Sequence, residues 1–264
     1  MKLVRFFVTI IFFLLFLMPQ PLFAAESSSP LNKLDEMAEL TLQMTKAGRF
    51  EEAKMLLNDF SNEFTTVNAQ QSFSMDELRI LTISHNLALE SINNSTGDLE
   101  QKVNAVTKFR LVMDALYSQY QPLWVEMEDP LMEAYSGVKL AVEEGNVEKY
   151  HTTLNVFLSK YNIIEPSIKL DVPVERAQAL DARISYLDHY RQKVLESTEA
   201  MAELSSLETD LEKLFNNMTE DEADPSLWWV IISTGSIIVS TLSYVGWRKY
   251  KGESEAKKSE RQKN

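Results

Sequence analysis

The sequence predicts an all-α fold: an extracytoplasmic helical bundle or helical-hairpin repeat of about eight helices, followed by one C-terminal transmembrane helix. Three observations predict it. The chain has only 7 Gly and 8 Pro in 264 residues and is rich in good helix formers. Apolar residues recur at spacings of three and four, which is typical of amphipathic helices. One stretch, residues 227–247, carries no charge and is long enough to cross a bilayer.

Aromatic and basic residues at the ends of 227–247 indicate a membrane interface. Trp228 and Trp247 are separated by about 28 Å of helix, close to the thickness of a hydrocarbon core. The candidate interface residues are Trp228, Trp229, Trp247, Arg248 and Lys249. Since basic residues follow the span, the positive-inside bias places the tail, residues 248–264, in the cytoplasm, and everything before the span on the other side. We expect residues 253–263, a short charged stretch, to be disordered.

Residues 1–25 have the pattern of a signal peptide. Lys2 and Arg5 precede an apolar run that is too short for a comfortable span, and Pro19 ends it. Cleavage is expected near Ala24. The alternative is an uncleaved N-terminal anchor.

The ectodomain, residues 26–226, is strongly acidic and free of cysteine. It has 36 acidic and 17 basic residues, a net charge of −19, whereas the tail has a net charge of +4. Such a domain repels nucleic acid and anionic lipid, so no nucleic-acid partner is expected. The absence of cysteine excludes disulfides and thiolate chemistry.

The first half of the ectodomain, residues 26–121, predicts four helices. The first follows a serine cap and Pro30, and a turn at Gly48 separates it from the second. A break at 93–97 separates the third from the fourth. The expected helices are Pro30–Lys46, Phe50–Phe64, Met75–Ile92 and Leu99–Tyr120.

The second half, residues 122–226, repeats part of the first at an offset of 97 residues. The turn at Gly145 corresponds to Gly48, and Leu154 and Phe157 correspond to Leu57 and Phe60. This predicts an internal duplication of a helical hairpin. The alternative is a chance resemblance between two amphipathic helices. Residues 174–218 contain no Gly or Pro, so either two packed helices or one long helix fits their pattern, which is interrupted at 188–193.

No motif in the sequence indicates a reaction. The three histidines are not at metal-ligand spacing, and no nucleophile elbow or phosphate-binding glycine loop occurs. Paired carboxylates such as 51–52, 143–144 and 126–129 fit solvated faces better than acid–base pairs. We therefore assign no catalytic, cofactor-binding or metal-binding residue and expect no cofactor.

Two features indicate contacts with other chains. Trp124 is the tryptophan outside the membrane ends, and it either contacts a partner or fills the seam between two packed units. Within the span, serines three and four residues apart share one helix face, which would let a second membrane helix approach closely. The alternative is tolerated small residues in a lone anchor. These serines are Ser233, Ser236, Ser240 and Ser243.

The layout of the whole chain resembles the sporulation protein YpjB family of endospore-forming bacteria. The resemblance rests on the length, the signal peptide, the acidic cysteine-free helical ectodomain and the C-terminal span that ends in Trp247-Arg248-Lys249. It implies a membrane-anchored protein associated with spore formation. It implies no catalytic residues.

Three functions remain in competition. The favoured one is a non-enzymatic interaction or scaffolding module, tethered to the cell membrane, whose partner is another envelope or membrane protein; self-association through the span is the second possible contact. An envelope enzyme that uses paired carboxylates would need a cleft with convergent polar groups. A sensor would need a signalling domain, for which 17 tail residues are too few.

Overall fold

The computed structural model describes residues 30–68, 73–117, 121–197, 199–220 and 225–261. The described residues contain ten α-helices, one short 3-10 helix and no strand, which confirms the all-α prediction. The expected signal peptide lies outside them. The chain divides into two compact units, Met1–Tyr117 and Ser118–Asn264.

The described residues of unit 1 form four helices: α2 (Pro30–Lys46), α3 (Phe50–Asn68), α4 (Met75–Asn93) and α5 (Leu99–Tyr117). α2 packs along both α3 and α5, and α4 packs along α5 and more loosely on α3. Each helix therefore contacts two others, as in a four-helix bundle. The predicted starts of all four are confirmed.

The core of unit 1 is centred on aromatic rings. The Phe60 ring meets the Phe109 ring edge-on at 4.9 Å between centroids and stacks on His85 at 5.5 Å. His85 is buried, and its Nε2 lies 2.8 Å from the Leu57 carbonyl oxygen. His85 is thus a core residue whose polar atom is satisfied by backbone.

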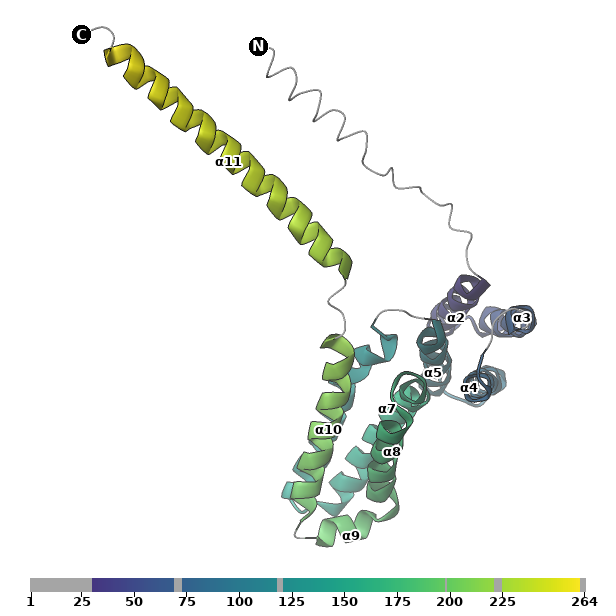
Figure 1. Cartoon of the computed structure of the whole chain (residues 1–264). Helices are drawn as coiled ribbons and strands as arrows, with labels where there is room; N and C mark the ends of the chain where they lie inside the picture. Colours follow the sequence, from purple (N-terminus) through teal and green to yellow (C-terminus); the bar gives the residue numbers. More distant parts are fainter. Residues whose placement is uncertain (1–29, 69–72, 118–120, 198, 221–224, 262–264) are drawn as a thin grey trace. The chain divides into compact units, whose positions relative to one another are not determined.

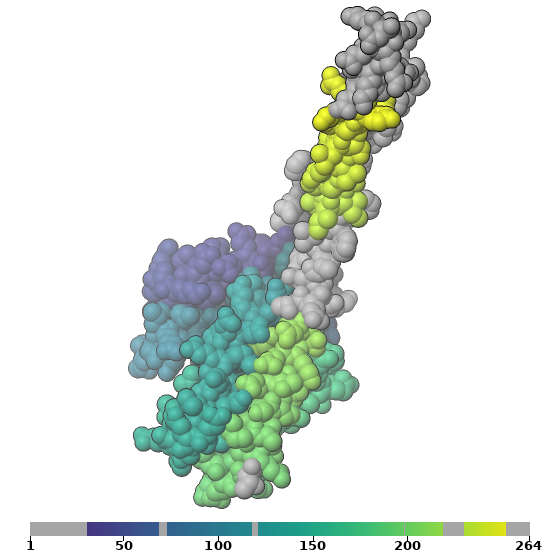
Figure 2. All heavy atoms as spheres, turned by 90° about the vertical axis from the view of Figure 1, so that its left-hand side faces the viewer, coloured from purple at the N-terminus to yellow at the C-terminus, as the bar shows by residue number. Residues whose placement is uncertain are grey.

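Unit 2 begins with a short 3-10 helix and contains six α-helices. In order they are η1 (Leu123–Met127), α6 (Glu128–Glu143), α7 (Val147–Asp171), α8 (Val174–His189), α9 (Arg191–Glu196), α10 (Ala200–Glu220) and α11 (Pro225–Arg261). α6 packs along α7 and α10, and α8 contacts α7 and α10. Figure 2 shows α10 alongside α6 on one face of this unit. The helices α6, α7, α8 and α10 thus contact one another in the same pairs as the four of unit 1, but α8 and α10 touch at fewer positions than α4 and α5.

The hairpins α2–α3 and α6–α7 close with identical hydrogen bonds at the predicted offset of 97. Gly48 has φ +72° and Gly145 has φ +62°. The Gly48 amide donates to the Thr45 carbonyl, and the Arg49 amide donates to the Met44 carbonyl. The same two bonds join Gly145 to Val142 and Asn146 to Ala141. Both turns are therefore Schellman motifs, which end a helix with a left-handed residue.

The core positions of the two hairpins also correspond. Leu57 and Phe60 in α3, and Leu154 and Phe157 in α7, are all at most 2% exposed. The expectation that both phenylalanines lie in the core is confirmed. The two hairpins thus share the hydrogen bonds of their turns and the positions of their buried residues, as two copies of one duplicated hairpin would.

Two details of unit 2 differ from the expectations. Residues 174–220 form neither one helix nor two, because α9 separates α8 from α10. Tyr190, at the junction of α8 and α9, has φ −114° and ψ 35°, so its backbone leaves the helical region there. Residues 253–261, which were expected to be disordered, are helical instead: α11 continues without a break to Arg261. Strong helix formers extend a helix that is already nucleated, and residues 253–261 contain no Gly or Pro.

Candidate functional site

The helix α11 is the most exposed apolar element among the described residues. Its segment Val230–Lys251 has 22 residues and a mean hydropathy of 1.5, and none of its apolar stretch is buried against the described parts of the chain. By length and composition it can cross a membrane. A run of isoleucine, valine and leucine side chains stays open to solvent along it, and such a surface marks a contact with lipid or with another apolar surface.

The described end of this segment carries the predicted aromatic and basic residues. Trp247 is exposed and lies 6.5 Å from Tyr244 between ring centroids, and the Lys251 Nζ lies 5.4 Å from the Trp247 ring centroid. Arg248 and Lys249 are exposed on the same helix. A lysine that folds back over a tryptophan ring is common where a helix leaves the hydrocarbon region. Trp228 and Trp229 lie in the helical part of α11, and their side chains lie outside the described residues.

The four serines of the span are all exposed on α11. Ser233 Oγ donates to the Val230 carbonyl oxygen at 3.1 Å, which satisfies the hydroxyl within the helix. Residues three and four apart lie on one face, so the stripe Ser233, Ser236, Ser240 and Ser243 is continuous. Its role in helix association remains a prediction.

Trp124 belongs to the core of unit 2, and the interpretation as a partner contact is wrong for the folded chain. Its side chain is fully buried in η1. The indole Nε1 donates to Asp171 Oδ2 at 2.7 Å, and its ring lies 5.5 Å from the Phe215 ring. Packing against α10 and a satisfied indole N–H leave no surface for a partner. These contacts of Trp124 lie within unit 2. The alternative, a tryptophan that fills the seam between the two packed units, stays a prediction.

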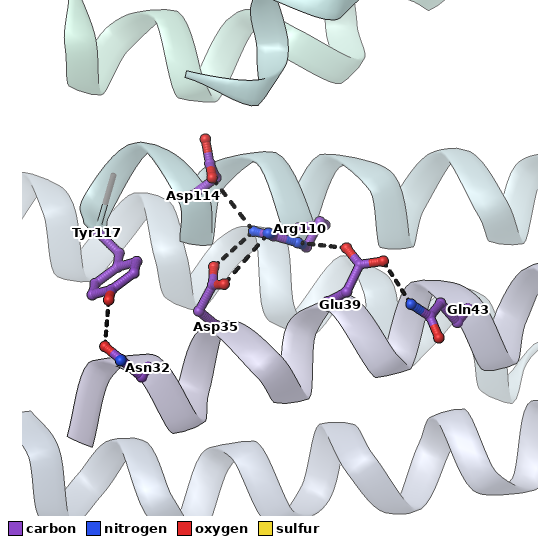
Figure 3. Close-up of polar contacts among 7 residues, drawn as sticks. All are labelled: Asn32, Asp35, Glu39, Gln43, Arg110, Asp114 and Tyr117. Atoms are coloured by element: carbon purple, nitrogen blue, oxygen red, sulfur yellow. Dashed lines mark hydrogen bonds and ion pairs between the residues drawn. The ribbon is translucent and has the colours of Figure 1, made fainter. Parts of the chain in front are cut away.

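A charged cluster in unit 1 was not predicted from the sequence (Figure 3). Arg110 of α5 is 7% exposed. Its Nη1 lies 2.8 Å from Asp35 Oδ1 and 3.8 Å from Asp114 Oδ1, and its Nε lies 3.0 Å from Glu39 Oε2. The available signal was the spacing of four that places Asp35 and Glu39 on one face of α2, and Arg110 and Asp114 on one face of α5.

Burial and hydrogen bonding act in opposite directions within this cluster. Burial raises the pKa of Asp35, although the Arg110 guanidinium opposes the shift. A hydrogen bond from Gln43, together with Arg110, lowers the pKa of Glu39 against the effect of burial. A guanidinium does not release its proton in this pH range. The cluster therefore holds two helices together and offers no proton donor of ordinary strength.

A second polar cluster lies between α7 and α8. Tyr161 Oη donates to Asp181 Oδ1 at 2.6 Å, and Lys169 Nζ lies 2.8 Å from Asp181 Oδ2 and 2.5 Å from Glu165 Oε1. Burial raises the pKa of Tyr161, and the hydrogen bond to Asp181 raises it further. Burial alone would lower the pKa of Lys169, but its two carboxylate partners raise it. These groups satisfy one another across the helix pair.

The carboxylate pairs considered from the sequence lie at the surface. Glu52 pairs with Arg49 at 3.0 Å and Glu144 pairs with Lys149 at 2.8 Å. Carboxylates 126, 128 and 129 border a hollow of about 260 Å³ beside η1. Within the described parts of the chain, no three His, Asp or Glu side chains come together as metal ligands would.

Comparison with known proteins identifies relatives along most of the chain. The sequence model of the family described as sporulation protein YpjB (SpoYpjB) matches residues 31–259. The uncharacterized protein YpjB of Bacillus subtilis (strain 168) is 36% identical over 234 residues, which cover 87% of this chain and 88% of that protein. No solved structure matches.

Proposed function

Because the chain belongs to the sporulation protein YpjB family, we propose that it is a single-pass membrane protein of sporulating cells whose helical ectodomain is a non-enzymatic interaction or scaffolding module. The observation that carries this proposal is α11, whose apolar surface is exposed along 22 residues. Only lipid or a second membrane helix can cover such a surface without exposing it to water.

The charge distribution supports one orientation. Arg248 and Lys249 follow the span directly, whereas the residues before it are acidic. The tail is then cytoplasmic and the ectodomain extracytoplasmic, with the signal peptide removed near Ala24. In this orientation the tether confines the ectodomain to a thin layer over the membrane and raises its effective concentration for membrane-bound partners.

The arrangement of polar side chains supports interaction rather than catalysis. The Arg110 cluster joins helices of unit 1, the Tyr161–Asp181 cluster joins helices of unit 2, and the polar groups of each cluster bind one another. The net charge of −19 on residues 26–226 would steer a basic partner surface towards the ectodomain. The partner is therefore another envelope or membrane protein with a basic face, and the serine stripe offers a second contact within the membrane.

Protease protection tests the topology. Intact protoplasts that carry the chain with a tag after Asn264 are treated with protease. We expect loss of residues 26–226 and survival of a tagged fragment that contains α11. An ectodomain that stays protected would show the opposite orientation and overturn the proposal. Crosslinking in the same cells, from positions in both units, identifies the proteins that the ectodomain contacts.

A further inference from the structure

A partly open groove lies between α8 and α10 of unit 2. Its volume is about 390 Å³, and mainly apolar atoms line it. Its walls are formed by Ala182, Arg183, Tyr186, Leu187, Glu203, Ser206 and Leu207. Leu187 and Leu207 are nearly buried and form its floor, while Ala182 and Glu203 are exposed at its edges.

The groove follows from the insertion of α9. In unit 1 the third and fourth helices, α4 and α5, are joined by a turn at 94–98 and pack along each other. In unit 2 the third and fourth long helices are α8 and α10, and α9 joins their ends (Figure 1). α8 and α10 consequently touch at few positions. The space that helix packing fills in unit 1 is left open in unit 2.

The rim of the groove has the composition of a binding surface. The Tyr186 ring lies 5.1 Å from the Tyr190 ring, and Tyr190 is 52% exposed. Tyr186 lines the groove and is partly buried, whereas Tyr190 lies next to it and has the Lys193 Nζ 5.7 Å above its ring. Tyrosines beside an apolar hollow supply much of the affinity in protein interfaces. Arg183 does not determine the charge of the rim, because it pairs with Asp210 at 2.6 Å and donates to Ser206 at 2.9 Å.

Two carboxylates near the start of α10 are free to interact with a charged ligand of the groove. Glu199 and Glu203 are exposed, and neither makes an ion pair with a residue that the structure describes. Glu203 lies in the first turn of α10 and Glu199 immediately precedes this helix; the Glu203 amide donates to the Glu199 carbonyl oxygen at 3.1 Å, so the two residues lie about one turn apart. Residues 121–220 as a whole have 19 acidic and 9 basic residues. An apolar groove with this rim is complementary to a cationic, apolar ligand and repels anionic lipid and nucleic acid.

We propose that the α8–α10 groove binds an amphipathic helix of a partner protein that carries Lys or Arg one turn apart beside its apolar face. This inference rests on the proposed function and gives the interaction module a surface. A helix placed between two helices buries apolar side chains in the groove, and its basic residues face Glu199 and Glu203. A small molecule would stay largely exposed in a groove that is half open to solvent.

A binding measurement with matched variants tests the groove. The full chain is held in nanodiscs of phosphatidylcholine, which carry no net charge. The probe is a fluorescent amphipathic helix of leucine and lysine, about 18 residues or five turns long, and the control peptide has glutamate in place of lysine. We expect anisotropy to report binding of the lysine peptide and not of the glutamate peptide.

Substitutions then locate the contact. Ala182→Trp fills the groove, and Glu203→Lys reverses the charge at its edge; each should weaken the lysine peptide about tenfold. Glu212→Lys is the matched control, since nine residues along α10 place Glu212 on the opposite face. It makes the same change in net charge and should alter affinity less than about twofold. Circular dichroism of each variant confirms that it is folded.

Three outcomes would overturn the inference: no binding to the wild-type chain, equal binding by all variants, or an equal loss in Glu212→Lys and Glu203→Lys. The last would mean that acidity alone attracts the peptide. The protoplast experiment fails or succeeds independently of these outcomes, because it measures orientation and not the groove. The proposed function and its proposed surface can therefore be rejected separately.

Discussion

Arg110 compensates three carboxylates from two helices of unit 1. Replacement by methionine keeps most of the volume and removes the only cation of the cluster among the described residues. Half-buried Asp35 then loses its cation and stays beside Glu39, which repels it, and we expect unfolding to become easier by about 3 kcal/mol at pH 7. Urea unfolding of the ectodomain measures the loss, and Arg110→Lys, which keeps the charge, should lose less.

The loss in Arg110→Met should depend on pH. Without the guanidinium, burial and mutual repulsion raise the pKa of Asp35 further above its ordinary value, in the direction it already has. A carboxyl with a raised pKa in the folded state binds a proton more readily when folded. The unfolding free energy of the variant therefore rises as the pH falls through that folded pKa. The difference from wild type should shrink between pH 7 and pH 4, and a constant difference would contradict this account.

Two buried tyrosines of unit 2 differ in whether the hydroxyl group forms a hydrogen bond. Tyr135 Oη donates to the Leu204 carbonyl oxygen at 2.8 Å, whereas the buried Tyr150 Oη has no hydrogen-bond partner among the described residues. Burial raises the pKa of Tyr150 to about 12. Tyr150→Phe removes an unsatisfied group and should stabilise unit 2 by about 1 kcal/mol, while Tyr135→Phe should destabilise it by about 1 kcal/mol. Thermal unfolding of the two variants should shift in opposite directions; equal shifts would mean that an unseen partner satisfies Tyr150.

At the scale of the element, the two Schellman turns allow a test of the duplicated hairpin. A Cβ added at Gly48 or Gly145 would meet no atom within 4 Å, so only the left-handed backbone opposes a side chain there. Gly48→Ala and Gly145→Ala should each cost about 1–2 kcal/mol. Gly97→Ala is the control, because its added Cβ makes ordinary contacts and its φ is not left-handed. Unequal losses at 48 and 145 would contradict equivalent hairpins.

The sequence predicts helices best where residues that begin or end a helix flank a stretch with helical apolar periodicity. Pro30, Gly48 and the serine cap at Ser74 mark their boundaries by local chemistry, and Ser74 forms the full capping box with Glu77. Between 174 and 220 no Gly or Pro occurs, and none marks Tyr190, where the backbone leaves the helical region. The apolar periodicity also does not predict that Thr41 and Thr45 are buried. Both lie buried in α2, where their hydroxyls donate to carbonyls one turn earlier.

The sequence does not predict that charged side chains are buried in unit 1. An apolar stripe predicts which face of α5 turns inward, but it cannot predict that Lys102 and Arg110 follow that face. Lys102 is buried because its ammonium donates to the last carbonyls of α4, including those of Ser91 and Asn94. Arg110 is buried because acids of α2 face it. Both partners come from another helix, so neither contact is visible within one helical period.

Two roles of the span, anchoring the chain and contacting another membrane helix, can be tested separately. Replacing 227–247 by a polyleucine helix of equal length keeps the tether and removes the serine stripe. Such a chain should restore function in a deletion strain if the span only anchors. Failure, with normal membrane insertion confirmed by fractionation, would assign a contact to Ser233, Ser236, Ser240 and Ser243. Restoring these four serines in the polyleucine helix should then recover function.

At the scale of the whole molecule, the proposal requires the fold and the membrane in one chain. The buried cores of both units are formed by helices that precede α11, so a secreted chain that ends at Asp224 should fold. It lacks the tether, and its local concentration at the membrane falls to that of any soluble protein. We therefore expect normal helical content by circular dichroism but no restoration of sporulation in a deletion strain.

Controls make this last outcome interpretable. The full chain, expressed at the same level, must restore sporulation, and the secreted form must be recovered intact outside the membrane. Overexpression of the secreted form should restore function partially, because mass action replaces the tether when the concentration is high enough. Full restoration at the ordinary level would show that tethering contributes nothing, and would favour a diffusible binding protein or an envelope enzyme over a membrane-bound scaffold.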